Sequence, residues 1–200
     1  MPSPARSIFL GAINKAILLR VTANDYRLKP MRSDAKQAYY HASLAASVAA
    51  WESYVENSVR DFIAASADPL QVAHTGLHSI VDGHARLALK KFNTPTWENS
   101  RTLLFQNTGY DPIGDWVWVR RRLSSLAVKA RLNEIVQVRH SFAHGFDIPA
   151  LDWTTSPLGV VRLTSSGLRF NEQLFLHLGR ETERGLKTHL GTVFGKRVVW

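Results

Sequence analysis

Apolar and polar positions follow a helical period along the stretch between Pro30 and Pro69. Its 38 residues include no glycine or proline, and large apolar side chains recur at steps of three or four. That spacing puts these side chains on one face of an α-helix, and the stretch is far longer than a typical strand. It therefore predicts a long amphipathic helix with the apolar stripe Tyr40, Leu44, Val48, Trp51, Val55, Val59 and Phe62.

A second stretch without glycine or proline spans the 30 residues between Gly114 and Gly145. Its length and apolar spacing predict a second long helix. Between the two long helices, residues 70–92 have a weaker helical pattern, and a short helix is expected over 97–106. The density of Gly, Asn, Asp and Pro in residues 107–114 is typical of a loop.

The pattern changes beyond Gly145. Residues 159–170 resemble two short β runs around a Ser-Ser-Gly turn, which predicts a small β-hairpin, and a last helix is expected from Asn171 to Leu190. Residues 1–30 are expected to form a basic N-terminal helical arm. Helices with apolar stripes must pack against one another. We therefore expect an all-α fold, an up-down helical bundle with a small β-hairpin near the C-terminus.

The composition excludes several kinds of site. The chain has no cysteine, which rules out disulfides, thiolate zinc sites and cysteine nucleophiles. The apolar stretch over 8–19 is interrupted by Asn14 and Lys15 and is too short to span a membrane. We therefore expect a cytoplasmic protein with no membrane partner. The net charge of +9 favours a polyanionic partner such as nucleic acid, although charge alone does not identify a site.

The end of the second long helix carries the most informative residues, Arg139-His-Ser-Phe-Ala-His144-Gly145. Gly145 fits the left-handed position that ends many helices. Basic residues in a last turn often do no more than complement the helix dipole. The apolar stripe Val128, Leu132 and Ile135, however, continues through Arg139, so a permanent charge lies where an apolar side chain is expected.

Such an arginine requires a partner of opposite charge. Glu52 and Glu56 on the first long helix could supply a carboxylate, and a substrate phosphate would serve equally well. Arg139 and His144 differ by roughly 140° around an ideal helix and by about 7.5 Å along it. Either the arginine curls back at the helix end, or a site combines residues from two copies of the helix.

His140 and His144 are four residues apart, a spacing that is also common among zinc ligands. A metal site would need a third ligand. The glutamate that follows the first histidine in metalloproteases is replaced here by Ser141. We therefore expect no metal at this position.

The segment Arg139-His-Ser-Phe-Ala-His144 resembles the R-x4-H signature of the HEPN superfamily. Together with the segments over 50–56, 95–105 and 109–116 and the final hairpin and helix, it is similar to the RiboL-PSP-HEPN branch over roughly residues 33–195. The resemblance implies a HEPN-like helical bundle over 33–195 that forms homodimers in which two motifs meet. Many such proteins are metal-independent endoribonucleases without cofactors that act as toxins or in defence.

The resemblance also implies roles for the motif residues. His144 would act as the acid or base, Arg139 would stabilise the transition state, and His140 would be a supporting group or a second proton carrier, with Glu52 and Ser141 in support. RNA would be cleaved by attack of its 2′-OH. An antitoxin or a defence-system protein is a further partner. One HEPN subgroup is neutralised by AMPylation of a tyrosine two residues after the motif histidine; Phe146 stands there, so this is not expected.

Basic residues at the start of the second long helix are candidates for RNA binding, with Trp116 and Trp118 nearby for base stacking. The same residues could equally be a solvated face and two core anchors. Two alternatives to the enzyme remain, an inactive HEPN scaffold that binds nucleic acid or a partner protein, and a plain helical interaction domain. The candidate RNA-binding residues are Arg120, Arg121, Arg122, Lys129 and Arg131.

Overall fold

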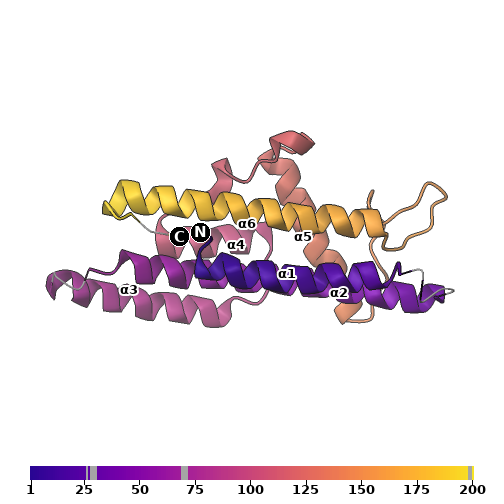
Figure 1. Ribbon diagram of the computed structural model, residues 1–200, viewed down its shortest axis with the longest axis horizontal. Helices are drawn as coiled ribbons and strands as arrows, with labels where there is room; N and C mark the ends of the chain where they lie inside the picture. The colour runs from indigo at the N-terminus through magenta and orange to yellow at the C-terminus, as the bar shows by residue number, and fades with distance from the viewer. Residues whose placement is uncertain (26, 28–30, 69–71, 198–199) are drawn as a thin grey trace.

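A computed structural model of the chain describes residues 1–25, 27, 31–68, 72–197 and 200. Within these residues the chain is mostly helical, which confirms the expected all-α class. The helices predicted between Pro30 and Pro69, over 70–92 and over 97–106 are all present. The structure has six α-helices in the described residues: α1 (Pro4–Thr22), α2 (Ser33–Ser66), α3 (Val72–Lys91), α4 (Trp97–Thr108), α5 (Ser125–Ala143) and α6 (Ser165–Phe194) (Figure 1).

α1, α2, α3 and α6 run along the long axis of the molecule (Figure 1). α1, α2 and α6 lie side by side, and α5 crosses them behind α6 (Figure 1). α3 packs against α2 and α4. The crossing means that the two ends of α5 lie on opposite sides of α6, so the segment before α5 and the residues at its end are exposed on different parts of the surface.

The core forms where α2 meets α6 and α4. All seven members of the predicted α2 stripe are buried. Trp51 of this stripe contacts the rings of Trp116 and Phe175, each with centroids 5.8 Å away. The Trp116 indole N–H donates a hydrogen bond to Thr182 Oγ1 at 2.9 Å. Because Trp116 and Trp118 are both buried, they anchor the loop after α4 to the core.

The predicted β-hairpin over 159–170 is wrong. In the described chain this region contains a single isolated bridge between Thr155 and Val161, and the Ser-Ser-Gly sequence is the first turn of α6. Thr164 is the N-cap, and its Oγ1 accepts a hydrogen bond from the Gly167 N–H at 3.1 Å. Gly167 also packs closely against Trp153. A capping threonine and a packing requirement for glycine therefore produce the same signal as a hairpin turn.

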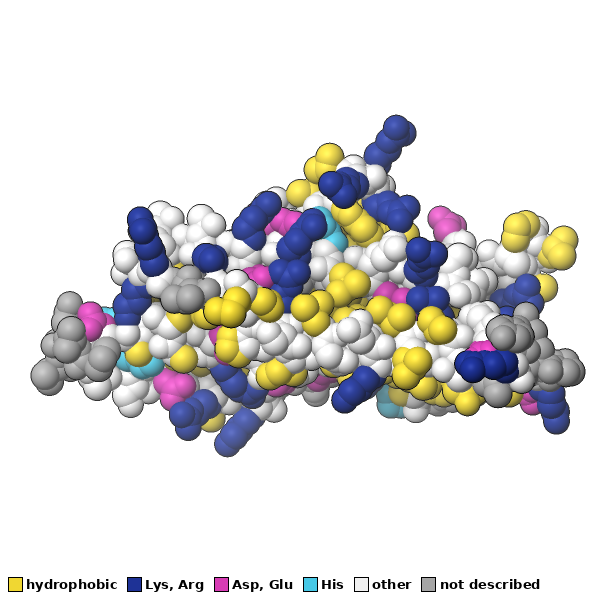
Figure 2. Space-filling model, in the orientation of Figure 1, with side chains coloured by type: hydrophobic (Ala, Val, Ile, Leu, Met, Phe, Trp, Pro, Cys, Tyr) yellow, Lys and Arg dark blue, Asp and Glu magenta, His cyan; other side chains and the backbone are white. Residues whose placement is uncertain are grey.

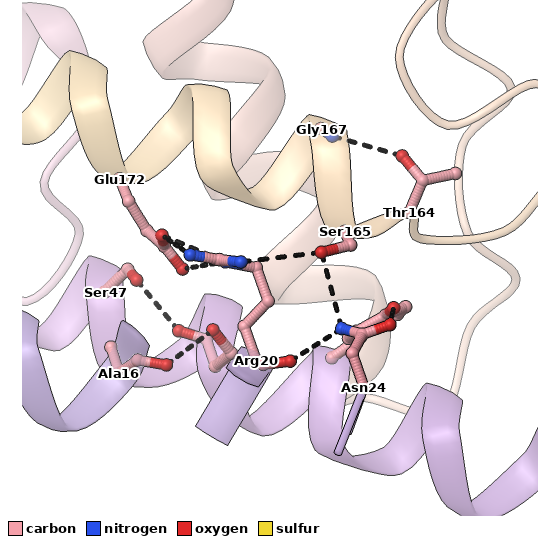
Figure 3. A network of polar contacts seen from close by, with 10 residues as sticks. Ala16, Arg20, Asn24, Ser47, Thr164, Ser165, Gly167 and Glu172 are labelled. Carbon is pink, nitrogen blue, oxygen red and sulfur yellow. Dashed lines mark hydrogen bonds and ion pairs between the residues drawn. The ribbon is translucent and has the colours of Figure 1, made fainter. Parts of the chain in front are cut away.

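A polar network joins α1 to α6 (Figure 3). Arg20 Nε donates to Glu172 Oε1 at 2.8 Å and Arg20 Nη2 donates to Glu172 Oε2 at 2.9 Å, a bidentate pair in which Glu172 is only 3% exposed. Asn24 Nδ2 donates to the Arg20 carbonyl at 2.8 Å, and Tyr40 Oη donates to Asn24 Oδ1 at 2.9 Å. The N-terminal helix is thus fixed on the bundle by ionic and hydrogen-bond contacts.

The same helix also contributes to the core. Phe9 and Ile13 are buried, and Phe9 contacts the ring of Tyr54 at 4.9 Å. The predicted end of the basic arm at residue 30 lies outside the described residues. Of the helices in the described chain, none combines the length and the apolar composition that a bilayer crossing requires.

Candidate functional site

The end of α5 is closed by a Schellman motif. Gly145 has φ +69°, and its N–H donates to the Phe142 carbonyl at 3.3 Å, while the Phe146 N–H donates to the Ser141 carbonyl at 2.8 Å. These bonds satisfy carbonyls that the helix end would otherwise leave unpaired. The predicted role of Gly145 as a helix terminator is therefore confirmed, and His144 has a fixed backbone position as the C-cap residue.

Two imidazoles meet on the exposed side of this helix end. The rings of His140 and His144 have centroids 4.1 Å apart and planes inclined by 47°. Phe146 stacks on His144 with centroids 6.0 Å apart. All three side chains are exposed to solvent. A ligand can therefore reach both imidazoles directly, and either ring can exchange a proton with it.

Arg139 lies on the other side of the helix end and is half-buried. Within the described chain its guanidinium forms no hydrogen bond and no ion pair. It is nevertheless near enough to Glu52 on α2 to affect that carboxyl. Burial raises the pKa of Glu52, the neighbouring Glu56 raises it further, and the charge of Arg139 lowers it. A half-buried guanidinium with open donors is suited to hold an anion.

Ser141 and Phe142 connect the motif to the bundle. Ser141 is buried, and its Oγ donates to the Val138 carbonyl at 2.9 Å. Phe142 is 49% exposed, and its ring stacks on the imidazole of His41. The apolar stripe of α5 thus leaves the core gradually, from fully buried Ile135 to half-exposed Phe142.

His41 is not among the site residues predicted from the sequence. The residue is 8% exposed, its buried Nδ1 has no hydrogen-bond partner among the described residues, and burial lowers its pKa. One signal was available. His41 and Glu52 are eleven residues apart, so on an ideal helix they differ by only about 20° in direction. Both therefore belong to the α2 face turned toward the end of α5.

The candidate RNA-binding residues fall into two groups. Arg120 and Arg121 lie in the short 3-10 helix η3 (Val119–Arg121), and Arg122 follows with φ +54°. All three are exposed, and they form a corner before α5 instead of its first turn. α5 has 19 residues, so this corner and His144 at the end of the motif are separated by about 28 Å along the helix.

Lys129 and Arg131 are engaged within the chain. Lys129 pairs with Glu98 at 2.7 Å and lies over the Trp97 ring. Arg131 Nε donates to Asn171 Oδ1 at 2.9 Å, and its guanidinium lies 4.5 Å from the centroid of the Trp153 ring. Burial lowers the pKa of Arg131. These two side chains support the packing of α5 in the monomer.

The spacing of His140 and His144 is also that of many zinc ligands. Among the residues that the structure describes, no group of three or more His, Asp or Glu side chains is arranged to hold a metal ion. His140 and His144 therefore have no third protein ligand within the described chain.

Comparison with protein families identifies a match over most of the chain. The model of the family described as RiboL-PSP-HEPN matches residues 13–170, which include α2, α5 and the whole Arg139–His144 segment. Neither the curated proteins nor the solved structures give a significant match.

Proposed function

Because the chain belongs to the RiboL-PSP-HEPN family, as its sequence resemblance predicts, we propose that the end of α5 is a metal-independent endoribonuclease site. HEPN domains are often ribonucleases, and they often dimerise and bind RNA. The observation that supports this function is that one helix end carries two exposed imidazoles in contact and the half-buried guanidinium of Arg139, which forms no hydrogen bond or ion pair within the described chain. Cationic and proton-transferring groups are the two kinds of group that RNA cleavage without a metal requires.

The proposed reaction is an internal transesterification. His144 removes the proton from a ribose 2′-OH, and the 2′-oxygen attacks the adjacent phosphorus. The bond from phosphorus to the 5′-oxygen breaks, leaving a 2′,3′-cyclic phosphate, and protonated His140 gives a proton to the leaving 5′-oxygen. Arg139 donates hydrogen bonds to the non-bridging oxygens and stabilises the charge that develops on them.

Glu52 and Ser141 have supporting roles in this proposal. Glu52 orients the Arg139 guanidinium from α2 through their electrostatic attraction. Ser141 acts through the backbone, because its carbonyl accepts the hydrogen bond that closes the helix end beneath His144. The exposed corner of Arg120, Arg121 and Arg122 contacts the RNA backbone.

A homodimer completes the site in this proposal. Arg139 and His144 lie on different sides of α5, so one copy does not direct both groups at one phosphate without bending the arginine back. Phe142 and Phe146 beside the motif are 49% and 67% exposed. Apolar rings exposed next to the site provide area for a symmetric contact between two helix ends. We place this activity in a toxin or defence role, with an antitoxin or defence protein as a partner.

The test is cleavage of single-stranded RNA by the purified protein in EDTA. We expect cleavage by the wild type, a loss of about 10²- to 10⁴-fold for His144→Ala, and a loss of about 10²- to 10³-fold for Arg139→Gln. The matched controls are His84→Ala and Arg86→Gln, which change exposed residues of α3. Both variant proteins should cleave RNA like the wild type. Activity that needs a divalent ion, or that survives His144→Ala, contradicts the proposal.

The second candidate is a HEPN scaffold without activity. It is favoured by the electrostatic contact between Arg139 and Glu52, which could be the only task of the arginine. In that case Arg139→Gln would disrupt dimerisation while the helices stay folded, and no RNA would be cut by the wild type. Loss of cleavage by a variant with an unchanged dimer supports the enzyme instead.

A further inference from the structure

A basic pocket lies away from the motif, between α1, the corner before α5 and α6. It has a volume of about 430 Å³, and its walls include Arg6 of α1, Arg120 and Arg121 of the corner and Arg180 of α6. Lys and Arg side chains gather over α6 and the projecting segment on this face (Figure 2). Three segments that are distant in sequence thus direct four guanidinium groups at one hollow.

The walls of this pocket are held in place by the core. The corner is closed by two backbone hydrogen bonds between Trp118 and Leu123, at 2.9 and 3.1 Å. His177 of α6 stacks on Trp118 with centroids 5.1 Å apart and planes 11° apart, and its Nε2 donates to the Val117 carbonyl at 2.8 Å. The corner also contains Arg122 in a left-handed conformation that is unfavourable for a side chain. Its arginines are therefore presented by a preorganised backbone.

The pocket has an excess of positive charge. Arg6 pairs with Glu183, and Arg180 pairs with Glu181 at 2.8 Å. Arg121 donates to the neutral Gln173 Oε1 at 2.9 Å. Within the described chain Arg120 forms no hydrogen bond or ion pair. Four guanidinium groups are thus balanced by two carboxylates, so an anion of at least two charges would be attracted.

The surroundings indicate which kind of anion fits. The Trp118 ring is 9% exposed and is covered by His177 and Arg121, so it offers no free face for stacking a base. Exposed Arg122 extends the positive charge beyond the pocket, whereas Arg184 is paired with Asp115 and Glu181. The site therefore offers cationic hydrogen-bond donors but no aromatic ring on which a base could stack, and its positive charge extends beyond one pocket. Such a surface fits a chain of phosphates better than a single nucleotide.

We propose that this pocket binds the phosphodiester backbone of single-stranded RNA at a site separate from the Arg139–His144 end of α5. The choice of RNA as the polyanion rests on the proposed function. Because the corner and the motif lie at opposite ends of α5, the pocket holds a part of the strand that is about 28 Å from His144 in the same copy. Binding there is independent of sequence, because it is made through phosphates.

The test is the salt dependence of RNA binding in a His144→Ala background, where the strand stays intact. Each lost contact to a single strand reduces the slope of log K against log salt by about 0.7. Replacing both Arg120→Gln and Arg180→Gln should therefore make the slope shallower by about 1.4. The matched control pair is Arg86→Gln with Lys90→Gln on α3, which removes the same charge from exposed positions and should change the slope much less.

An unchanged slope in the Arg120→Gln and Arg180→Gln protein, or an equal change in the control pair, overturns the proposal. Displacement of the RNA by equimolar ATP also overturns it, because the pocket would then be a site for free nucleotides. Binding and cleavage are separate measurements here. If the wild type fails to cut RNA while the slope changes as expected, the pocket stands and the nuclease proposal falls.

Discussion

The imidazole of His41 on α2 stacks on the ring of Phe142 in the motif segment of α5, with centroids 4.2 Å apart and planes inclined by only 11°. This contact links the N-terminal third of α2, the longest helix in the described chain, to the residues that follow Arg139. It fixes how the end of α5 lies on α2, and with it the distance from Arg139 to Glu52.

Replacing His41 by phenylalanine should reduce the loss of folding stability at acid pH. Burial lowers the pKa of folded His41, so the unfolded chain takes up a proton first as the pH falls below about 6.5. The stability that neutral His41 contributes is therefore present above that pH and lost below it. In urea unfolding at about pH 8 and about pH 5.5, His41→Phe should lose less stability than the wild type. Equal losses in both proteins contradict this, and exposed His84→Gln is the control that should follow the wild type.

Gly145→Ala should damage the site through the backbone. The left-handed φ of +69° costs a residue with a Cβ about 1 to 2 kcal/mol, so the helix end opens and His144 loses its fixed position. We expect a lower rate of RNA cleavage and a slightly lower midpoint of unfolding. Gly159→Ala is the matched control, because Gly159 has φ +75° and open space around it but lies away from the motif. Gly159→Ala should lose about as much stability as Gly145→Ala but should cleave RNA at the wild-type rate. Equal cleavage rates for the two variants exclude a role of the helix end.

Glu172→Gln should destabilise the whole bundle. The substitution leaves the Arg20 guanidinium, whose side chain is 13% exposed, without its carboxylate partner, and breaking such a buried pair costs about 3 to 5 kcal/mol. The exposed pair of Arg86 and Asp82 provides the comparison, because Asp82→Asn should change stability by less than about 1 kcal/mol. Urea unfolding measures both. A loss below about 1 kcal/mol for Glu172→Gln would show that the network in Figure 3 does not hold α1 on α6.

Two inactive variants should restore activity when they are combined. If Arg139 of one copy acts with His144 of the other, a mixed dimer of Arg139→Ala and His144→Ala retains one intact site. Random pairing makes half of the dimers mixed, so the refolded mixture should recover about a quarter of the wild-type rate. No recovery, with mixed dimers demonstrated by native mass spectrometry, excludes a site divided between copies in this way.

The sequence predicts the helices well because their signals are local and repeated. All seven members of the α2 stripe are buried, and Gly145 ends α5 as its position indicates. The hairpin error has a physical origin. Thr164, Ser165 and Gly167 are good turn residues and good helix-start residues, and only the packing of Gly167 against Trp153 decides between the two.

The candidate site is less accessible to sequence reasoning because it depends on contacts between helices. Arg131 is a basic residue of the kind that contacts RNA, yet Asn171 and two aromatic rings from other segments enclose its side chain. His41 has no histidine or acid close in sequence, and only the crossing of α5 over α2 brings it to Phe142. The contacts of such residues can be recognised only from the three-dimensional arrangement of the helices.

The most direct measurement is the product of a defined cleavage. An oligonucleotide with one ribonucleotide in a DNA strand is incubated with the wild-type protein in EDTA, beside the all-DNA strand. We expect cutting only after the ribonucleotide, with a 2′,3′-cyclic phosphate found by mass spectrometry and no product from His144→Ala. Cleavage of the all-DNA strand, or a product that carries a 3′-hydroxyl, would contradict attack by the 2′-oxygen at this helix end.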